Sequence, residues 1–181
     1  MHDCAGQTFA DGFMSTDFID TVLRNFEPIT LEEMKDIRLM NRTDTKYVIS
    51  VAQLEALLNA AKMDYRVQEV DGERNIAYHT IYYDTADRKM YIAHQNGKKT
   101  REKIRLRSYV SSGLTFFLFK NKNNRGRTDK KRIKIKEQPF LHKPETIEFL
   151  KKHALFTADE ISPQLENYFT RITLVNRDKT E

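Results

Sequence analysis

Alternating cationic and apolar residues between positions 101 and 136 constrain the fold more than any other feature of the chain. In segment 101–107 every second residue is Arg or Lys, and Ile104 and Leu106 lie between them. Segment 130–136 repeats this pattern around Ile133 and Ile135. Because successive side chains of a strand point to opposite faces, each segment is predicted to be a strand with one cationic and one apolar face. The apolar face needs cover, and the cationic face must be solvated or bind an anion.

Positive charge is concentrated in this part of the chain. Between residues 98 and 136 fifteen Lys and Arg residues face two acids, a net charge of +13, whereas the whole 181-residue chain carries +5 and the remainder therefore −8. Such a concentration is typical of a site for a polyanion, but charge alone does not distinguish nucleic acid from nucleotide or polyphosphate. No helix-turn-helix, zinc-finger or RNP-type signature is present, and the five histidines lack zinc-ligand spacing.

The remaining segments predict an α+β fold. Residues 1–15 have the composition of a disordered tail, and residues 16–181 are predicted to form a single domain. Helices are expected at about 15–27, from residue 30 onward where Thr30 and Glu33 match a capping box, and at 51–62, 86–97 and 144–153. Strands are expected at 41–50, 64–70, 75–84, 101–109, 114–123, 129–137 and 165–177.

Three local details complete this prediction. A tight turn at Asp71-Gly72 is expected to join two strands as a hairpin. Ser50 is expected to cap a helix that buries Leu54, Leu57 and Leu58, and a later helix is expected to bury Ile147 and Leu150. The helices at 51–62, 86–95 and 143–154 are expected to cover the apolar face. No membrane-length apolar run or secretory signal is visible, which favours a cytoplasmic protein.

Several segments together resemble the VTC domain. In chain order they are NRTDTKYVI, YHTIYYDTADRKMYIAHQNG, KIRLRSY, KNKN, DKKRIKI and LENYFTRITLVNR, within roughly residues 38–178. VTC domains are the catalytic domains of the vacuolar transporter chaperone polyphosphate polymerase and of its bacterial relatives, in the triphosphate tunnel superfamily. The resemblance implies an antiparallel β tunnel with flanking helices, in which Lys and Arg side chains bind ATP and inorganic polyphosphate.

The resemblance also implies an activity and its residues. The family's polymerases transfer the γ-phosphate of ATP to a growing polyphosphate chain with a divalent metal, manganese or magnesium. The implied substrate-binding residues are Lys46, Arg105, Arg107, Lys120, Lys130, Arg132 and Arg171, of which Arg105, Arg107 and Lys130 are the implied catalytic residues. Strand parity favours Lys130 over Lys131. Phosphoryl transfer needs alignment and charge neutralisation more than a protein nucleophile, which suits these side chains.

Two departures from the family pattern matter. Tunnel hydrolases open with a Glu-x-Glu-x-Lys strand, whereas this chain has Arg42, Asp44 and Lys46 there, which disfavours a triphosphatase. The family's last strands, with a further arginine and the metal-binding glutamate, are expected beyond Glu181, so no metal ligand is assigned and the chain corresponds to about two-thirds of the domain. A polyphosphate- or nucleotide-binding module without turnover, and a nucleic-acid-binding protein, stay open as alternatives. Nucleic acid is not the expected partner, and homo-oligomer formation is left open.

Overall fold

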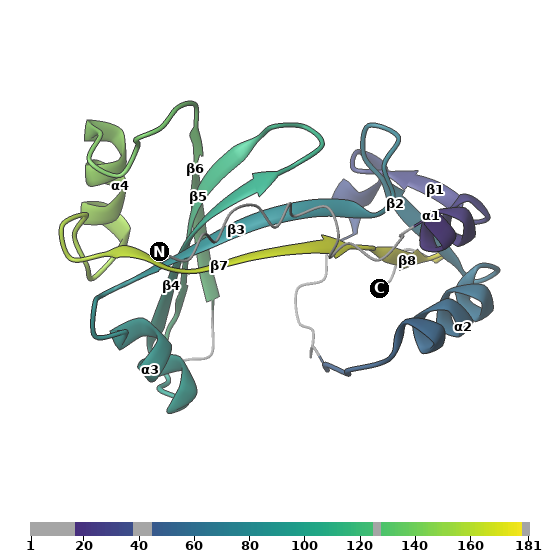
Figure 1. Ribbon diagram of the computed structural model, residues 1–181, viewed down its shortest axis with the longest axis horizontal. Coiled ribbons are helices and arrows are strands. Elements are labelled where there is room, and N and C mark those ends of the chain that lie inside the picture. Colours follow the sequence, from purple (N-terminus) through teal and green to yellow (C-terminus); the bar gives the residue numbers. More distant parts are fainter. Residues whose placement is uncertain (1–16, 38–44, 125–127, 179–181) are drawn as a thin grey trace, which may run out of the picture. The chain divides into compact units, whose positions relative to one another are not determined.

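The computed structural model describes residues 17–37, 45–124 and 128–178, which belong to two compact units (Figure 1). One unit comprises the described residues up to Asn75 together with those from Ile172 onward, and the other is Ile76–Arg171. The predicted disordered tail lies outside the described residues. Both units combine helices with a β-sheet, so the α+β prediction is confirmed. Within the described residues, no helix has both the length and the apolar character that a membrane span requires.

The first unit is built on a three-stranded sheet. Its strands β1 (Glu27–Thr30), β2 (Tyr65–Glu69) and β8 (Leu174–Asn176) lie in the order β1-β2-β8, with β1 parallel and β8 antiparallel to β2. Its helices are α1 (Asp17–Arg24), the short 3-10 helix η1 (Glu33–Asp36) and α2 (Val51–Ala61). The core contains Leu23, Phe26, Leu58 and Val67. Helix α2 therefore packs in this core, and the expectation that it helps to cover the apolar face of the basic strands is wrong.

The predicted short helix from residue 30 forms only as the 3-10 helix η1 at Glu33–Asp36, and its capping contact is present. The backbone N–H and the hydroxyl of Thr30 both donate to Glu33 Oε2 at 2.9 Å, and the Glu33 N–H donates to Thr30 Oγ1 at 3.3 Å. These contacts lower the pKa of Glu33 to about 2. Because β1 pairs with β2 up to Thr30, the chain stays extended to that point, and only the single 3-10 turn η1 follows.

The predicted strand at 41–50 does not form in its described part. Residues 41–44 lie outside the described residues, and residues 45–50 are exposed, without regular structure. A strand needs hydrogen-bonding partners, and none of the described strands pairs with this segment. Ser50 does cap α2, through a reciprocal box with Gln53, as predicted. Leu57 is 55% exposed, however, because α2 packs through Leu58 and partly Leu54.

The turn at Asp71-Gly72 forms, but the hairpin around it does not. Asp71 and Gly72 have φ values of 52° and 83°, and Val70 and Glu73 exchange two backbone hydrogen bonds. Gly tolerates this left-handed backbone at no steric cost. Beyond this turn β2 pairs with β1 and β8, while the next strand joins the sheet of the second unit. Local turn chemistry thus identified the turn, and long-range pairing decided the partners.

The second unit is built on a five-stranded antiparallel sheet. In chain order the second unit contains β3 (Ile76–Asp84), α3 (Lys89–Gln95), β4 (Arg101–Tyr109), β5 (Thr115–Lys122), β6 (Thr128–Ile135), α4 (Pro144–His153) and β7 (Ser162–Arg171). The strand order is β6-β5-β4-β3-β7, and every neighbouring pair is antiparallel. The sheet is open at β6 and β7, and the described strands do not close it into a barrel. The single strand predicted at 165–177 is divided between β7 and β8.

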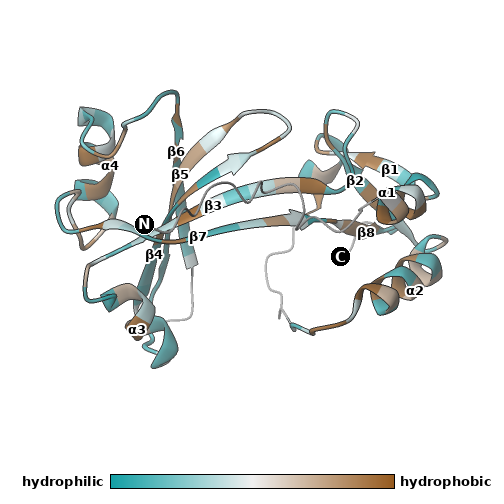
Figure 2. Cartoon of the chain, viewed as in Figure 1, coloured by the Kyte–Doolittle hydropathy of each residue, from teal (hydrophilic) through white to brown (hydrophobic). Residues whose placement is uncertain are grey.

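One face of this sheet forms the core of the second unit. This apolar face carries Ile104, Leu106, Phe117, Phe119 and Ile135, and Figure 2 shows how such residues alternate with hydrophilic ones along the strands. Phe149 and Leu150 of α4 and Met90 of α3 pack against it, which confirms that these two helices cover it. Ile147 is 45% exposed, contrary to prediction, because α4 turns Thr146, Phe149 and Leu150 inward.

Candidate functional site

The pairing register places cationic residues of four strands on the other face of the five-stranded sheet. Residues directly opposite in antiparallel strands project to the same side. Arg107 of β4 pairs with Phe116 of β5, and Lys120 of β5 pairs with both Lys103 of β4 and Lys130 of β6. This register defines a cationic face that carries Arg101, Lys103, Arg105, Arg107, Lys120, Lys122, Lys130, Arg132, Lys134 and Arg171.

Six of the seven predicted binding residues lie on this cationic face. They are Arg105, Arg107, Lys120, Lys130, Arg132 and Arg171. Lys131 projects to the opposite face, where its Nζ lies 3.5 Å from Asp129 Oδ1, so the register agrees with the parity choice of Lys130. Lys46 lies in the exposed segment 45–50 of the first unit, and its role stays a prediction from the sequence.

A row of three lysines crosses the cationic face. Lys103, Lys120 and Lys130 are direct cross-strand neighbours on β4, β5 and β6. Such neighbours have Cβ atoms about 5 Å apart, and like charges at that spacing repel. Lys103 was not among the predicted binding residues, nor was Lys134 of β6. Strand parity already placed both on the cationic side of their strands, and that signal could have identified them.

Aromatic rings hold two of the guanidinium groups. Arg107 Cζ lies 5.1 Å from the Tyr78 ring centroid and 5.3 Å from that of Phe169, and its Nε donates to Thr80 Oγ1 at 3.1 Å. Arg132 Cζ lies 4.7 Å from the ring centroid of Phe116. These contacts use the flat side of a guanidinium, and for Arg107 also its Nε–H. An anion would therefore be bound by the two terminal nitrogens of Arg107.

No acid of β4, β5, β6 or β7 shares the cationic face. Glu102 of β4, Asp129 of β6 and Glu166 of β7 all project to the opposite face. Burial, together with the charge of Arg105, lowers the pKa of Arg107, which shows that the positive charge of Arg107 is destabilised where it stands. A bound polyanion would relieve this repulsion, so the face is chemically suited to phosphate groups.

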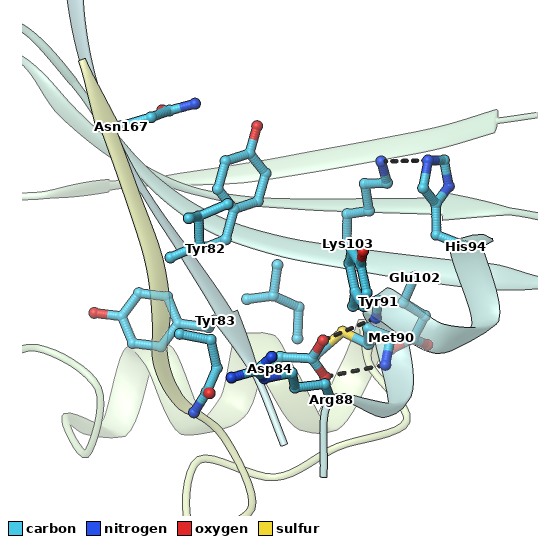
Figure 3. A pocket seen from close by; sticks show the side chains of 13 residues that line it. Tyr82, Tyr83, Asp84, Arg88, Met90, Tyr91, His94, Glu102, Lys103 and Asn167 are labelled. Carbon is cyan, nitrogen blue, oxygen red and sulfur yellow. Dashed lines mark hydrogen bonds between the residues drawn. The ribbon is translucent and has the colours of Figure 1, made fainter. Parts of the chain in front are cut away.

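The described residues do not form a metal site. Among them, no group of three or more His, Cys, Asp or Glu could hold a metal ion. Asp84 binds the first turn of α3: its Oδ1 accepts from Met90 N at 3.0 Å and its Oδ2 from Tyr91 N at 2.8 Å (Figure 3). Glu102 accepts from Leu155 N at 3.0 Å, and burial raises its pKa. Both carboxylates therefore have structural partners.

Comparison with known proteins identifies a family. The sequence model of the VTC domain matches residues 41–180 of the chain. No curated protein matches it. Among solved structures, that of a candidate adenylate cyclase from Vibrio parahaemolyticus is 17% identical, with a TM-score of 0.39, over 66% of this chain and 55% of that one. The chain thus spans little more than half the length of that protein.

Proposed function

Because the chain belongs to the VTC domain family, we propose that its cationic face binds the triphosphate of ATP and inorganic polyphosphate. The family includes the catalytic domains of polyphosphate polymerases. We further propose that the complete protein transfers the γ-phosphate of ATP to a growing polyphosphate chain. The observation that carries this proposal is the pairing register, which gathers cations from β4, β5, β6 and β7 with no acid of these four strands among them.

The arrangement of the cations suits a linear polyanion. Neighbouring strands lie about 4.8 Å apart, so the row of Lys103, Lys120 and Lys130 offers ammonium groups at regular intervals to successive phosphates. Arg105 and Arg107 follow one another on the same side of β4, where each guanidinium can bind two non-bridging oxygens. Lysines supply mobile point charges and arginines supply fixed forks, a combination that holds a flexible phosphate chain in register.

The proposed reaction needs no protein nucleophile. A terminal oxygen of polyphosphate attacks the γ-phosphorus of ATP in line, the new P–O bond forms, and the bond to the β-phosphate oxygen breaks with its electron pair leaving on ADP. Arg105 and Arg107 would align the non-bridging oxygens, and Lys130 would neutralise charge as it develops. The half-buried position of Arg107 strengthens such contacts because water screens them less.

Two measurements test the proposal. Isothermal titration calorimetry of the chain with tripolyphosphate should show binding that weakens steeply with salt, because the contacts are ionic. Incubating the full-length protein with ATP and manganese should yield long phosphate chains that a polyphosphatase degrades. Binding without product would leave a polyphosphate-binding module and overturn the polymerase part. Absence of tripolyphosphate binding by a folded chain would overturn the proposal as a whole.

A nucleic-acid-binding protein is the competing reading of the same charge. Phosphate backbones attract any basic surface, so a gel shift with DNA alone decides nothing. Competition separates the two: tripolyphosphate should displace bound DNA at low concentration, whereas DNA should displace tripolyphosphate poorly. The opposite order would favour the nucleic-acid reading.

A further inference from the structure

A pocket of about 540 Å³ adjoins the cationic face inside the second unit (Figure 3). Tyr82 and Lys103 line it from the face itself, and Tyr91 and His94 line it from α3. The carboxylates of Asp84 and Glu102 also line it, and both accept hydrogen bonds from backbone N–H groups. Its volume falls within the range of about 300 to 1,000 Å³ that small-molecule sites occupy. The proposed binding of a phosphate chain does not use this pocket, because phosphates gain nothing from its aromatic walls.

Two tyrosines give the pocket aromatic walls on rigid elements. Tyr82 is held in the register of β3, opposite Arg105 of β4. Tyr91 stands in the first turn of α3, whose start is fixed by Asp84, and its hydroxyl accepts a hydrogen bond from Gln95 Nε2 at 3.0 Å. Tyr91 is nevertheless 55% exposed. Exposed aromatic rings in a concave site are suited to stacking on a flat ligand.

Lys103 connects the pocket to the cationic face. It lines the pocket and is also the first member of the row that continues through Lys120 to Lys130. Its Nζ lies 3.3 Å from Nε2 of His94, which lines the same pocket (Figure 3). A ligand that fills the pocket would therefore have ammonium groups directly beside it. Only a ligand with both a flat aromatic part and a polyanionic part uses both features.

We infer that this pocket holds the base and ribose of a nucleoside triphosphate whose phosphates lie along the lysine row. The inference rests on the proposed function and adds to it a means of distinguishing the donor from the product. ATP would bind through both the pocket and the row, whereas polyphosphate would bind through the row alone. The amide of Asn167 and the ring of His94, both at the pocket, supply polar groups for the edges of a base.

Substitution of Tyr91 tests the inference. Tyr91→Ala removes the ring, keeps a strong helix former in α3 and leaves the backbone N–H that Asp84 accepts. Stacking of one base on an aromatic ring accounts for about a tenfold change in affinity, so ATP should bind about tenfold more weakly while tripolyphosphate binding is unchanged. Tyr168→Ala is the matched control, because Tyr168 is 54% exposed and lies on the opposite face of the sheet.

Calorimetry with both ligands separates the possible failures. If tripolyphosphate does not bind the unsubstituted chain, the proposed function fails. If it binds but Tyr91→Ala weakens ATP and tripolyphosphate equally, or weakens neither, only the pocket assignment is overturned. Tyr82→Leu, which keeps bulk without an aromatic ring, should also weaken ATP alone and provides a second variant if Tyr91→Ala perturbs α3. Lys103→Gln should weaken both ligands, because Lys103 belongs to the row.

Discussion

The two faces of the five-stranded sheet differ in character although their residues alternate along the same strands. One face is buried in the core, and the other carries the cationic side chains. On the apolar face Phe117 and Ile104 are 0% and 1% exposed, and α4 covers them. On the cationic face Lys130 and Arg132 are exposed, and Arg107 is half-buried against aromatic rings. A slip of one residue in any pairing would exchange the two sets. The packing of the core therefore also fixes which cations share a face.

The largest expected effect comes from emptying the apolar face. Phe117 contacts the rings of Tyr83, Phe140 and Phe149, with centroids 5.1–6.1 Å away. Phe117→Ala should lower the free energy of unfolding by about 3–5 kcal/mol, because it removes buried area and leaves a cavity. Urea titration followed by circular dichroism measures this change. A loss below about 1 kcal/mol would contradict the assignment of this face as the core.

The second largest effect is a loss of tripolyphosphate affinity when the arginines of the cationic face are removed. Arg105→Ala with Arg107→Ala should weaken tripolyphosphate binding more than about 100-fold, because each charge-assisted contact contributes about 1.5–3 kcal/mol. Calorimetry measures the affinity, and a urea titration checks that the sheet still folds. If the folded double variant bound tripolyphosphate as well as the unsubstituted chain, the cationic face would not be the binding site.

A smaller loss of tripolyphosphate affinity distinguishes the two faces of the sheet at two adjacent residues. Lys130 and Lys131 are neighbours in sequence but project to opposite faces. Lys130→Ala should weaken tripolyphosphate binding by about 1 kcal/mol, or roughly fivefold, as expected for loss of one exposed ammonium group. Lys131→Ala should leave it unchanged, because Lys131 lies beside Asp129 on the other face. Equal losses in the two variants would mean that total charge, and not the face, decides binding.

The smallest effect concerns Glu102, a buried carboxylate on the apolar side of β4. Burial raises the pKa of Glu102 above its ordinary value of 4.5, so the folded state binds this proton more tightly than the unfolded chain. This contribution to stability is present below that value and is lost as pH rises through the raised pKa. Glu102→Gln keeps an acceptor for Leu155 N and should flatten the fall in unfolding free energy above pH 4.5.

Urea titrations of both proteins between pH 4.5 and 7 measure this difference. Glu148→Gln, at an exposed carboxylate of α4, is the control, and its free energy of unfolding should fall with pH as steeply as that of the unsubstituted chain. If the free energy of unfolding of Glu102→Gln fell with pH as steeply as that of the unsubstituted chain, burial of Glu102 would not contribute to the pH dependence of stability.

Local patterns predicted the features whose cause is local. Alternation separated Arg105 and Arg107 from Ile104 and Leu106, and the turn at Asp71-Gly72 and the Ser50 cap formed as expected. These features depend on the pleat of one strand or on contacts three residues apart, so a short stretch of sequence contains their whole cause. The same alternation put Lys130 on the side of Arg132, and the pairing register between strands then placed six of the seven predicted binding residues on one face.

Tertiary structure decided what depends on distant partners. The sequence by itself determined which residues of each strand share a side, because side-chain direction follows from backbone geometry. It did not determine that β2 and β3 join different sheets, or that residues 45–50 have no partner among the described strands. Nor did it determine that Lys103, Lys120 and Lys130 are neighbours across three strands. Those outcomes depend on the free energy of contacts between segments far apart in the chain, where packing and register compete, and no local pattern contains that information.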